Sequence, residues 1–290
     1  MTETTLIKPA STIVLLREAA GAPEIYMVKR AAQAAFFGGA YVFPGGKVDK
    51  TDSAPEMLAR VRGVTPETAA RMQAEATVSA ALCVAALRET FEEANILLAV
   101  ERDGSPLNLQ DEARRASLSA ARKKLIGGDA GAFLALLSEL DLYLEAAQIV
   151  FFARWVTPEA EPRRFEASFF LAQTPDDQVA AHDEAETTEG LWLSAAQILQ
   201  KHKEGEIFLA PPTFRTLENF ARFTSVQSLL AHHQNNPAPI VRPYLRFGDD
   251  SEVQLLLDHD PEHPSPSSGP FVEGDSRIVL QEGRWWSRRG

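Results

Sequence analysis

Three glutamates follow Arg88 at a spacing that suits a helix: Glu89, Glu92 and Glu93. Residues at i, i+3 and i+4 share one helix face, so the three carboxylates are expected side by side. Like charges at this spacing repel, and a solvated acidic face is one interpretation. A bound divalent cation reverses that argument, because hard oxygen ligands suit Mg²⁺ or Mn²⁺, which usually reach a substrate through its phosphates.

A glycine-rich segment upstream favours the metal site over the solvated face. Phe43 and Pro44 end a predicted strand, and Gly45 and Gly46 follow as a predicted turn. Two consecutive glycines allow positive φ angles and let another group come close to the backbone. We therefore expect this turn to lie against the acidic helix.

Together these segments resemble the signature of the Nudix family of hydrolases. That signature is Gly, five residues, Glu, seven residues, then Arg-Glu-aliphatic-x-Glu-Glu-x-Gly-aliphatic. Gly46 is followed by five residues and Asp52, and the second half begins at Arg88. Asp52 replaces the usual Glu, Thr90 an aliphatic residue and Asn95 the final glycine. The last change is mild, since Asn tolerates the left-handed conformation of a helix C-cap.

The two halves of the signature are much further apart than in the family pattern. Thirty-five residues, 53 to 87, separate Asp52 from Arg88 where the pattern has seven. The segment is either an insertion into an intact motif or a spacer between two chance half-motifs. An intact motif predicts that Gly46 and Glu93 lie near each other.

The residues before the turn resemble the motif of coenzyme A-associated Nudix proteins. Arg30, Ala31, Gly39 and the segment from Phe43 to Gly46 match it in register, whereas Ala35 occupies the position of its second arginine. A subgroup of acyl-coenzyme A diphosphatases carries an insertion inside the Nudix signature, and the chain resembles that subgroup most. The resemblance implies substrate contacts by Arg30, Gly45 and Gly46.

Further candidates lie downstream. Arg163 and Arg164 form a basic pair that could hold phosphates, or be a solvated strand entrance. In Nudix proteins a glutamate from a later loop often joins the metal site or acts as base. Glu186 and Glu189 are equal candidates for that role here.

The resemblance implies the Nudix α/β/α sandwich, an α/β fold with a mixed sheet. We expect a Nudix domain over residues 1–235, with helical insertions at about 53–80 and 104–147. The second insertion is expected either as a lid or as packing bulk. Residues 236–290 are expected to form a small C-terminal β appendage that packs on the core or makes a homodimer contact.

Composition is typical of an ordinary globular enzyme. The 290 residues are 45% hydrophobic and carry a formal charge of −11, which argues against nucleic acid as the general partner. Neither a signal peptide nor a stretch able to span a membrane is evident, so we expect a cytoplasmic protein without a membrane partner. The single cysteine, Cys83, is expected to be a buried core thiol.

These observations predict a Nudix hydrolase that cleaves a phosphoanhydride with Mg²⁺ or Mn²⁺. Glu89, Glu92 and Glu93 are the expected metal ligands, and Arg88 is expected to orient a carboxylate. The expected catalytic residues are Arg88, Glu92, Glu93, Glu186 and Glu189. The expected substrate is coenzyme A or acyl-coenzyme A, split to 3′,5′-ADP and (acyl-)phosphopantetheine. The alternatives are an ADP-ribose or dinucleotide diphosphatase and a catalytically silent module that senses a nucleotide.

Overall fold

The computed structural model describes residues 6–33, 37–183, 185–248, 252–267, 269 and 272–290. Within these residues the central sheet has eight strands, in the order β10-β2-β1-β9-β8-β11, with β3 paired to β2 and β4 to β1. Its strands are β1 (Lys8–Arg17), β2 (Glu24–Arg30), β3 (Tyr41–Val42), β4 (Gly45–Lys47), β8 (Ile149–Val156), β9 (Phe165–Gln173), β10 (Thr187–Ser194) and β11 (Ile240–Val241).

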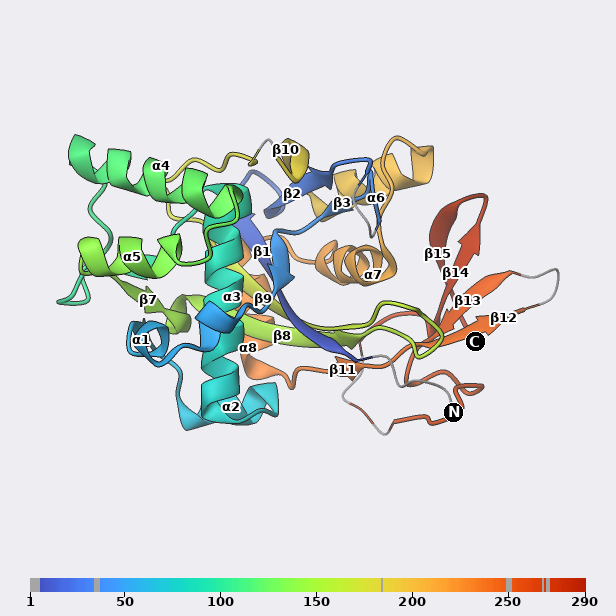
Figure 1. Cartoon of the computed structure of the whole chain (residues 1–290). Coiled ribbons are helices and arrows are strands. Elements are labelled where there is room, and N and C mark those ends of the chain that lie inside the picture. The colour runs from blue at the N-terminus through green and yellow to red at the C-terminus, as the bar shows by residue number, and fades with distance from the viewer. Residues whose placement is uncertain (1–5, 34–36, 184, 249–251, 268, 270–271) are drawn as a thin grey trace.

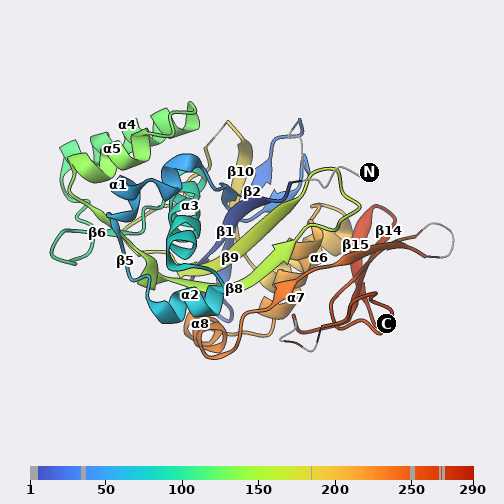
Figure 2. The same cartoon turned by 60° about the horizontal axis from the view of Figure 1, so that its bottom comes forward.

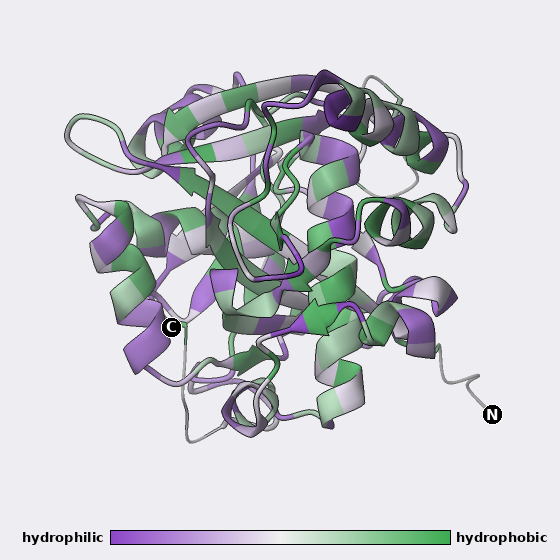
Figure 3. Ribbon diagram, turned by 90° about the vertical axis from the view of Figure 1, so that its left-hand side faces the viewer, coloured by the Kyte–Doolittle hydropathy of each residue, from purple (hydrophilic) through white to green (hydrophobic). Residues whose placement is uncertain are grey.

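The sheet is mixed, as expected. Strand β1 pairs in parallel with β9, from Lys8 opposite Phe165 to Leu16 opposite Gln173, and antiparallel with β2. Its side chains alternate between two hydrophobic cores, with Ile13 in one and Val14 in the other. Figure 3 shows these central strands mainly in the hydrophobic colour, whereas the outer helices mix both.

Helices cover both faces of the sheet, which gives the predicted three layers (Figures 1 and 2). The first core holds side chains of α3 (Ala76–Ala94), α4 (Glu112–Ile126) and α5 (Ala132–Glu139). The second holds those of α6 (Ala195–Glu204), α7 (Pro211–Phe220) and α8 (Val226–Asn235). Cys83 of α3 is buried as expected, and burial raises the pKa of its thiol to about 12.

The two segments interpreted as insertions contain short helices and contribute to a small three-stranded sheet. The first follows η1 (Lys50–Ser53) and has α1 (Pro55–Leu58), β5 (Val61–Arg62) and α2 (Pro66–Met72). The second follows β6 (Ala99–Val100) and, after its helices, has β7 (Tyr143–Glu145) and η2 (Ala146–Gln148). Thr65 caps α2 by accepting the Thr68 N–H at 3.2 Å. Strand β7 lies between β5 and β6, so the two insertions share one sheet. Such short strands, paired across a long sequence separation, have no local sequence pattern from which they could be predicted.

Residues beyond α8 form a second sheet, larger than expected from the sequence. Its four strands are β12 (Tyr244–Phe247), β13 (Val253–Leu256), β14 (Arg277–Gln281) and β15 (Arg284–Arg288), paired in that order within the described residues. Strand β11 joins the central sheet although it follows the predicted boundary at residue 235. Among the described residues, no helix combines the length and the apolar character needed to cross a bilayer.

Candidate active site

The acidic helix predicted from the sequence is the last turns of α3. Glu89, Glu92 and Glu93 lie on it and line one large cavity, so the i, i+3, i+4 spacing does place them on one face. The helix ends at Asn95, whose φ of 59° is the left-handed C-cap expected there. Thr90, the residue that departs from the aliphatic pattern, is buried and donates to the Ala86 carbonyl at 2.7 Å.

Arg88 connects the two halves of the split motif. Its Nε and Nη2 donate to the two oxygens of Asp52 at 2.8 and 3.0 Å, and Nη2 also donates to the Lys47 carbonyl at 3.0 Å. Asp52 is fully buried and Arg88 is 3% exposed. The same guanidinium donates to Glu89 at 2.9 Å. A bidentate pair fixes two side chains in one plane, so Asp52 and Arg88 hold together segments 36 positions apart.

The glycine segment lies directly against the acidic helix. Gly45 donates its N–H to Glu93 Oε2 at 2.9 Å, and a Cβ built on Gly46 would lie 2.3 Å from Glu89 Oε1. The motif is therefore spatially intact, as the first interpretation of the insertion required.

The conformational role expected for the glycines is wrong. Gly45 and Gly46 belong to strand β4, which pairs with β1, and neither is among the residues with positive φ. Glycine is needed because neighbours come too close for a side chain. A Cβ on Gly45 would lie 2.5 Å from the Ser11 carbonyl oxygen. These glycines allow close approach without forming a turn.

Burial makes the negative charges on α3 costly. It raises the pKa of Glu89 to about 7, although Arg88 opposes the shift. Burial, with the charge of Glu89, raises the pKa of Glu93 well above its ordinary value, although the Gly45 N–H partly offsets this. Burial also raises the pKa of Glu92, and the charges of Glu186 and Asp183 add to the effect. The site therefore holds more negative charge than its protein cations balance.

The loop before β10 brings a further carboxylate to the site and separates the two equal candidates. Glu186 lines the cavity, and its charge acts on Glu92. Glu189 is not among the lining residues, and its Oε2 accepts the Tyr41 hydroxyl at 2.7 Å. Asp183 fixes the loop, because its Oδ1 accepts the N–H groups of Glu186 and Thr187 at 3.1 and 2.8 Å. The geometry favours Glu186 over Glu189.

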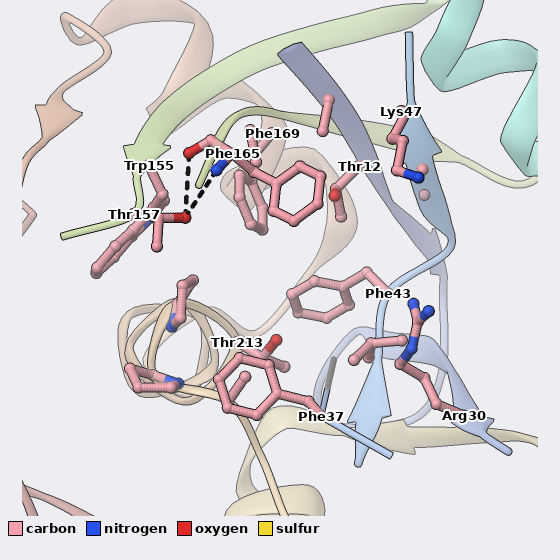
Figure 4. Close-up of a pocket in the computed structure, with 18 of the residues that line it drawn as sticks. Thr12, Arg30, Phe37, Phe43, Lys47, Trp155, Thr157, Phe165, Phe169 and Thr213 are labelled. Carbon is pink, nitrogen blue, oxygen red and sulfur yellow. Dashed lines mark hydrogen bonds between the residues drawn. The ribbon is translucent and has the colours of Figure 1, made fainter. Parts of the chain in front are cut away.

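The cavity has a volume of about 870 Å³. Arg30 and Lys47 lie on one side of it, and phenylalanines separate them from Trp155 and Thr157 on the other (Figure 4). The Nε of Arg30 is buried without a hydrogen-bond partner among the described residues. Arg30 also lowers the pKa of Glu93, against the larger effect of burial, so the two charges are close. This end of the cavity combines carboxylates with cations suited to phosphate.

The basic pair at residues 163 and 164 is not part of the cavity wall. Arg164 donates its Nε to the Thr157 carbonyl at 3.1 Å, and the exposed Arg163 precedes strand β9. Their expected contact with phosphate has no support in this arrangement. Ala35, the position that departs from the coenzyme A motif, lies outside the described residues.

Sequence reasoning missed Lys47 and Asp183 as site residues. Lys47 directly follows the glycine pair, and its position on β4 carries it to the cavity. Asp183 stands in the acidic loop, but only its hydrogen bonds distinguish it from its neighbours. The one available signal was the tendency of aspartate side chains in loops to accept hydrogen bonds from nearby backbone N–H groups.

The donor set fits a hard divalent cation. Several buried or half-buried carboxylates share one end of the cavity with raised pKa values, which is the chemistry that Mg²⁺ or Mn²⁺ prefers. Among the described residues, no three such side chains already converge as a ligand set, and Glu89 and Glu92 instead accept from Arg88. The fit rests on ligand chemistry and charge.

Stability of the metal-free protein is expected to fall as the pH rises from about 5 to about 8. The folded-state pKa of Glu89 is raised to about 7. The proton on Glu89 therefore stabilises the folded protein fully below the unfolded-state pKa, and this stabilisation is lost as the pH rises through the folded-state pKa. The loss is on the order of 3 kcal/mol. Added Mg²⁺ replaces the bound proton, so it should raise the melting temperature more at about pH 8 than at about pH 5.

Thermal unfolding with a chelator and with Mg²⁺, across this pH range, measures both effects. Glu89→Gln should flatten the pH dependence of the chelated protein. A Mg²⁺-induced shift in melting temperature that is equal at both ends of the range would contradict the linkage.

Comparison with known proteins places the chain among relatives. Residues 4–220 match the family model described as the NUDT19 Nudix domain. The protein named acyl-coenzyme A diphosphatase NUDT19 from Gallus gallus is 28% identical over 240 residues, which cover 71% of this chain and 63% of that protein. Its Homo sapiens counterpart is 25% identical over 237 residues, covering 71% and 62%. The chain thus spans less than two thirds of the length of these relatives.

A solved structure shares the fold. The crystal structure of a NUDIX hydrolase from Alicyclobacillus acidocaldarius superposes with a TM-score of 0.65 at 28% identity. The superposition covers 78% of this chain and 96% of that one.

Proposed function

Since the chain belongs to the Nudix hydrolases, and within them to the NUDT19 subgroup, we propose that it hydrolyses the diphosphate of coenzyme A or acyl-coenzyme A. The products would be 3′,5′-ADP and (acyl-)phosphopantetheine. One observation carries the proposal: the carboxylates of α3 occupy one end of a cavity whose remaining wall is largely apolar. Such a cavity suits a substrate with a diphosphate joined to a long, weakly polar arm.

Glu89, Glu92 and Glu93 would hold Mg²⁺ or Mn²⁺ against the diphosphate. When bound, the cation polarises a phosphoryl oxygen and lowers the pKa of a water molecule. Gly45 keeps the Glu93 carboxylate in place through its N–H, and Gly46 leaves room for Glu89. Arg88 orients Glu89 while its own position is fixed by Asp52. Arginine suits this position because its planar fork meets several carboxylates at once.

The remaining roles concern the attacking water and the phosphate charge. A general base must lie at the cavity, and Glu186 is among the lining residues whereas Glu189 is not and accepts from Tyr41, which supports Glu186 as the base. Arg30 and Lys47 would neutralise phosphate oxygens, because both are cations on the cavity wall. Arg30 is the stronger candidate, since its buried Nε makes no bond among the described residues.

Cleavage of a substrate panel tests the proposal. Coenzyme A, acyl-coenzyme A, ADP-ribose, NADH and nucleoside triphosphates would be incubated with Mg²⁺ or Mn²⁺, and the nucleotide products separated. Selective release of 3′,5′-ADP is the expected result. Selective cleavage of ADP-ribose or NADH would keep the hydrolase and overturn the coenzyme A substrate. Binding of a nucleotide without any turnover would instead support a silent sensing module.

A further inference from the structure

The C-terminal sheet has one apolar face, and that face lines the active-site cavity. In the strand register Phe247 stands opposite Val253, Val253 opposite Leu280, and Leu280 opposite Trp285. Leu245 and Leu255 form the next row on the same side. Six lining residues of the cavity come from this face: Leu245, Phe247, Val253, Leu255, Leu280 and Trp285.

The opposite face of the same sheet carries charged and polar side chains beside the buried Leu256 and Val279. Arg246 donates to Gln254 at 2.7 Å, Arg277 to Asp260 at 2.7 Å and Arg288 to Glu252 at 2.8 Å. Alternation along each strand therefore places these arginines on one face of the sheet and leaves the other face without charged side chains. The face without charged side chains is the one directed at the cavity.

This apolar face is only partly covered by the protein. Leu255 and Trp285 are buried in the second core, but Leu245, Val253 and Leu280 are half-buried and Phe247 is 66% exposed. Apolar surface left open beside a catalytic cleft typically marks a ligand-binding wall.

The wall facing the sheet is also apolar. Trp155 of β8 and Phe165 and Phe169 of β9 line the cavity, together with Phe43 (Figure 4). The nearby Thr157 hydroxyl already accepts the Phe165 N–H at 3.0 Å and donates to the Phe165 carbonyl at 3.2 Å. This part of the cavity therefore offers few free polar groups to the hydroxyls of a ribose.

Polar contacts fix the sheet to the Nudix core. His202 of α6 contacts the Trp285 carbonyl through Nε2 at 3.1 Å, and Ser287 donates to Glu218 of α7 at 2.6 Å. The buried Arg215 of α7 donates to the Asp275 carbonyl at 2.6 Å. The sheet is thus a fixed part of the cavity wall.

We propose that the apolar face of the C-terminal sheet binds the acyl chain of an acyl-coenzyme A and sets the preference for its length. The inference rests on the proposed function, because the diphosphate must lie at the carboxylate end for the chain to reach this face. An uncharged, flexible chain fits a wall of leucine, valine and aromatic side chains, whereas a second nucleotide would leave its polar groups without partners.

The test compares Phe247→Ser with Tyr244→Ser. Both residues are exposed aromatics on β12, at 66% and 45%, but only Phe247 lines the cavity. We would measure kcat/KM for coenzyme A and for acetyl-, decanoyl- and palmitoyl-coenzyme A. In the unmodified protein kcat/KM should rise with chain length. Phe247→Ser should lower the value for the long chains by about tenfold and leave free coenzyme A within about twofold.

Tyr244→Ser should leave every substrate within about twofold of the unmodified protein. Decanoyl-pantetheine, which lacks the diphosphate, should inhibit the unmodified protein competitively and Phe247→Ser about tenfold more weakly.

Equal cleavage of all coenzyme A species, unchanged by Phe247→Ser, would overturn this inference and leave the proposed function standing. Equal losses in the Phe247 and Tyr244 variants would also overturn it, because a general effect on the sheet would explain them. Absence of cleavage of any coenzyme A species would overturn both proposals.

Discussion

Replacing Glu93 by glutamine is expected to lower kcat/KM by about 10³-fold while the protein stays folded. Glu93 is 4% exposed and accepts the Gly45 N–H at 2.9 Å, a bond that the amide oxygen of glutamine can also accept. The glutamine side chain therefore fits the same space. Burial raises the pKa of the Glu93 carboxyl, which means that its charged form destabilises the folded protein. Because glutamine is neutral, the metal-free variant should unfold at the same temperature or higher at about pH 8.

Glu189→Gln is the matched control. Glu189 is a carboxylate of the same chain that bonds to Tyr41 and does not line the cavity, so its loss should change kcat/KM less than about twofold. Steady-state kinetics and thermal unfolding of both variants measure the comparison. Full activity in Glu93→Gln would show that Glu93 is not part of the active site. Unfolding of this variant would show that the role of Glu93 is structural.

The motif could be recognised from the sequence despite its interruption because its parts are local. A helix places i, i+3 and i+4 on one face whatever precedes it, so Glu89, Glu92 and Glu93 were placed together correctly. What joins the halves is a long-range pair, Asp52 with Arg88. Sequence reasoning could require that the halves meet but could not identify the residues that connect them.

Choosing between Glu186 and Glu189 required backbone geometry. The pairing of β10 with β2 shifts register between Thr187 and Glu189, so the regular alternation of side chains is interrupted between the two candidates. Period-two alternation cannot be extended through such a shift. The acidic loop was therefore visible in the sequence, but the position of each carboxylate was not.

The role of the C-terminal region was hidden for a different reason. The sequence indicated a small β appendage, whereas the four strands that form the sheet are defined by their pairing. Their contribution to the cavity depends on how the whole sheet packs beside α7. Contacts between elements distant in sequence leave no periodic signal.

Replacing Arg88 by methionine is expected to cost about 3–5 kcal/mol in the free energy of unfolding. The change leaves Asp52 fully buried without the two hydrogen bonds, at 2.8 and 3.0 Å, that balance its charge. It also removes the cation beside Glu89, so repulsion among the carboxylates increases. Burial alone would lower the pKa of Arg88, but the Asp52 hydrogen bond and the nearby carboxylates outweigh it, so the net pKa is raised.

A double-mutant cycle with Asp52→Asn separates this buried pair from the rest of the site. Asparagine is neutral, so Arg88→Met/Asp52→Asn should be more stable than Arg88→Met alone by about 2 kcal/mol in denaturant unfolding. If the losses of unfolding free energy in the two single variants simply added in the double variant, the pair would not couple the segments. A coupling of the expected size, with activity still abolished in the double variant, would show that Asp52 acts through Arg88: the aspartate stabilises the arginine, and the arginine orients the carboxylates that the reaction requires.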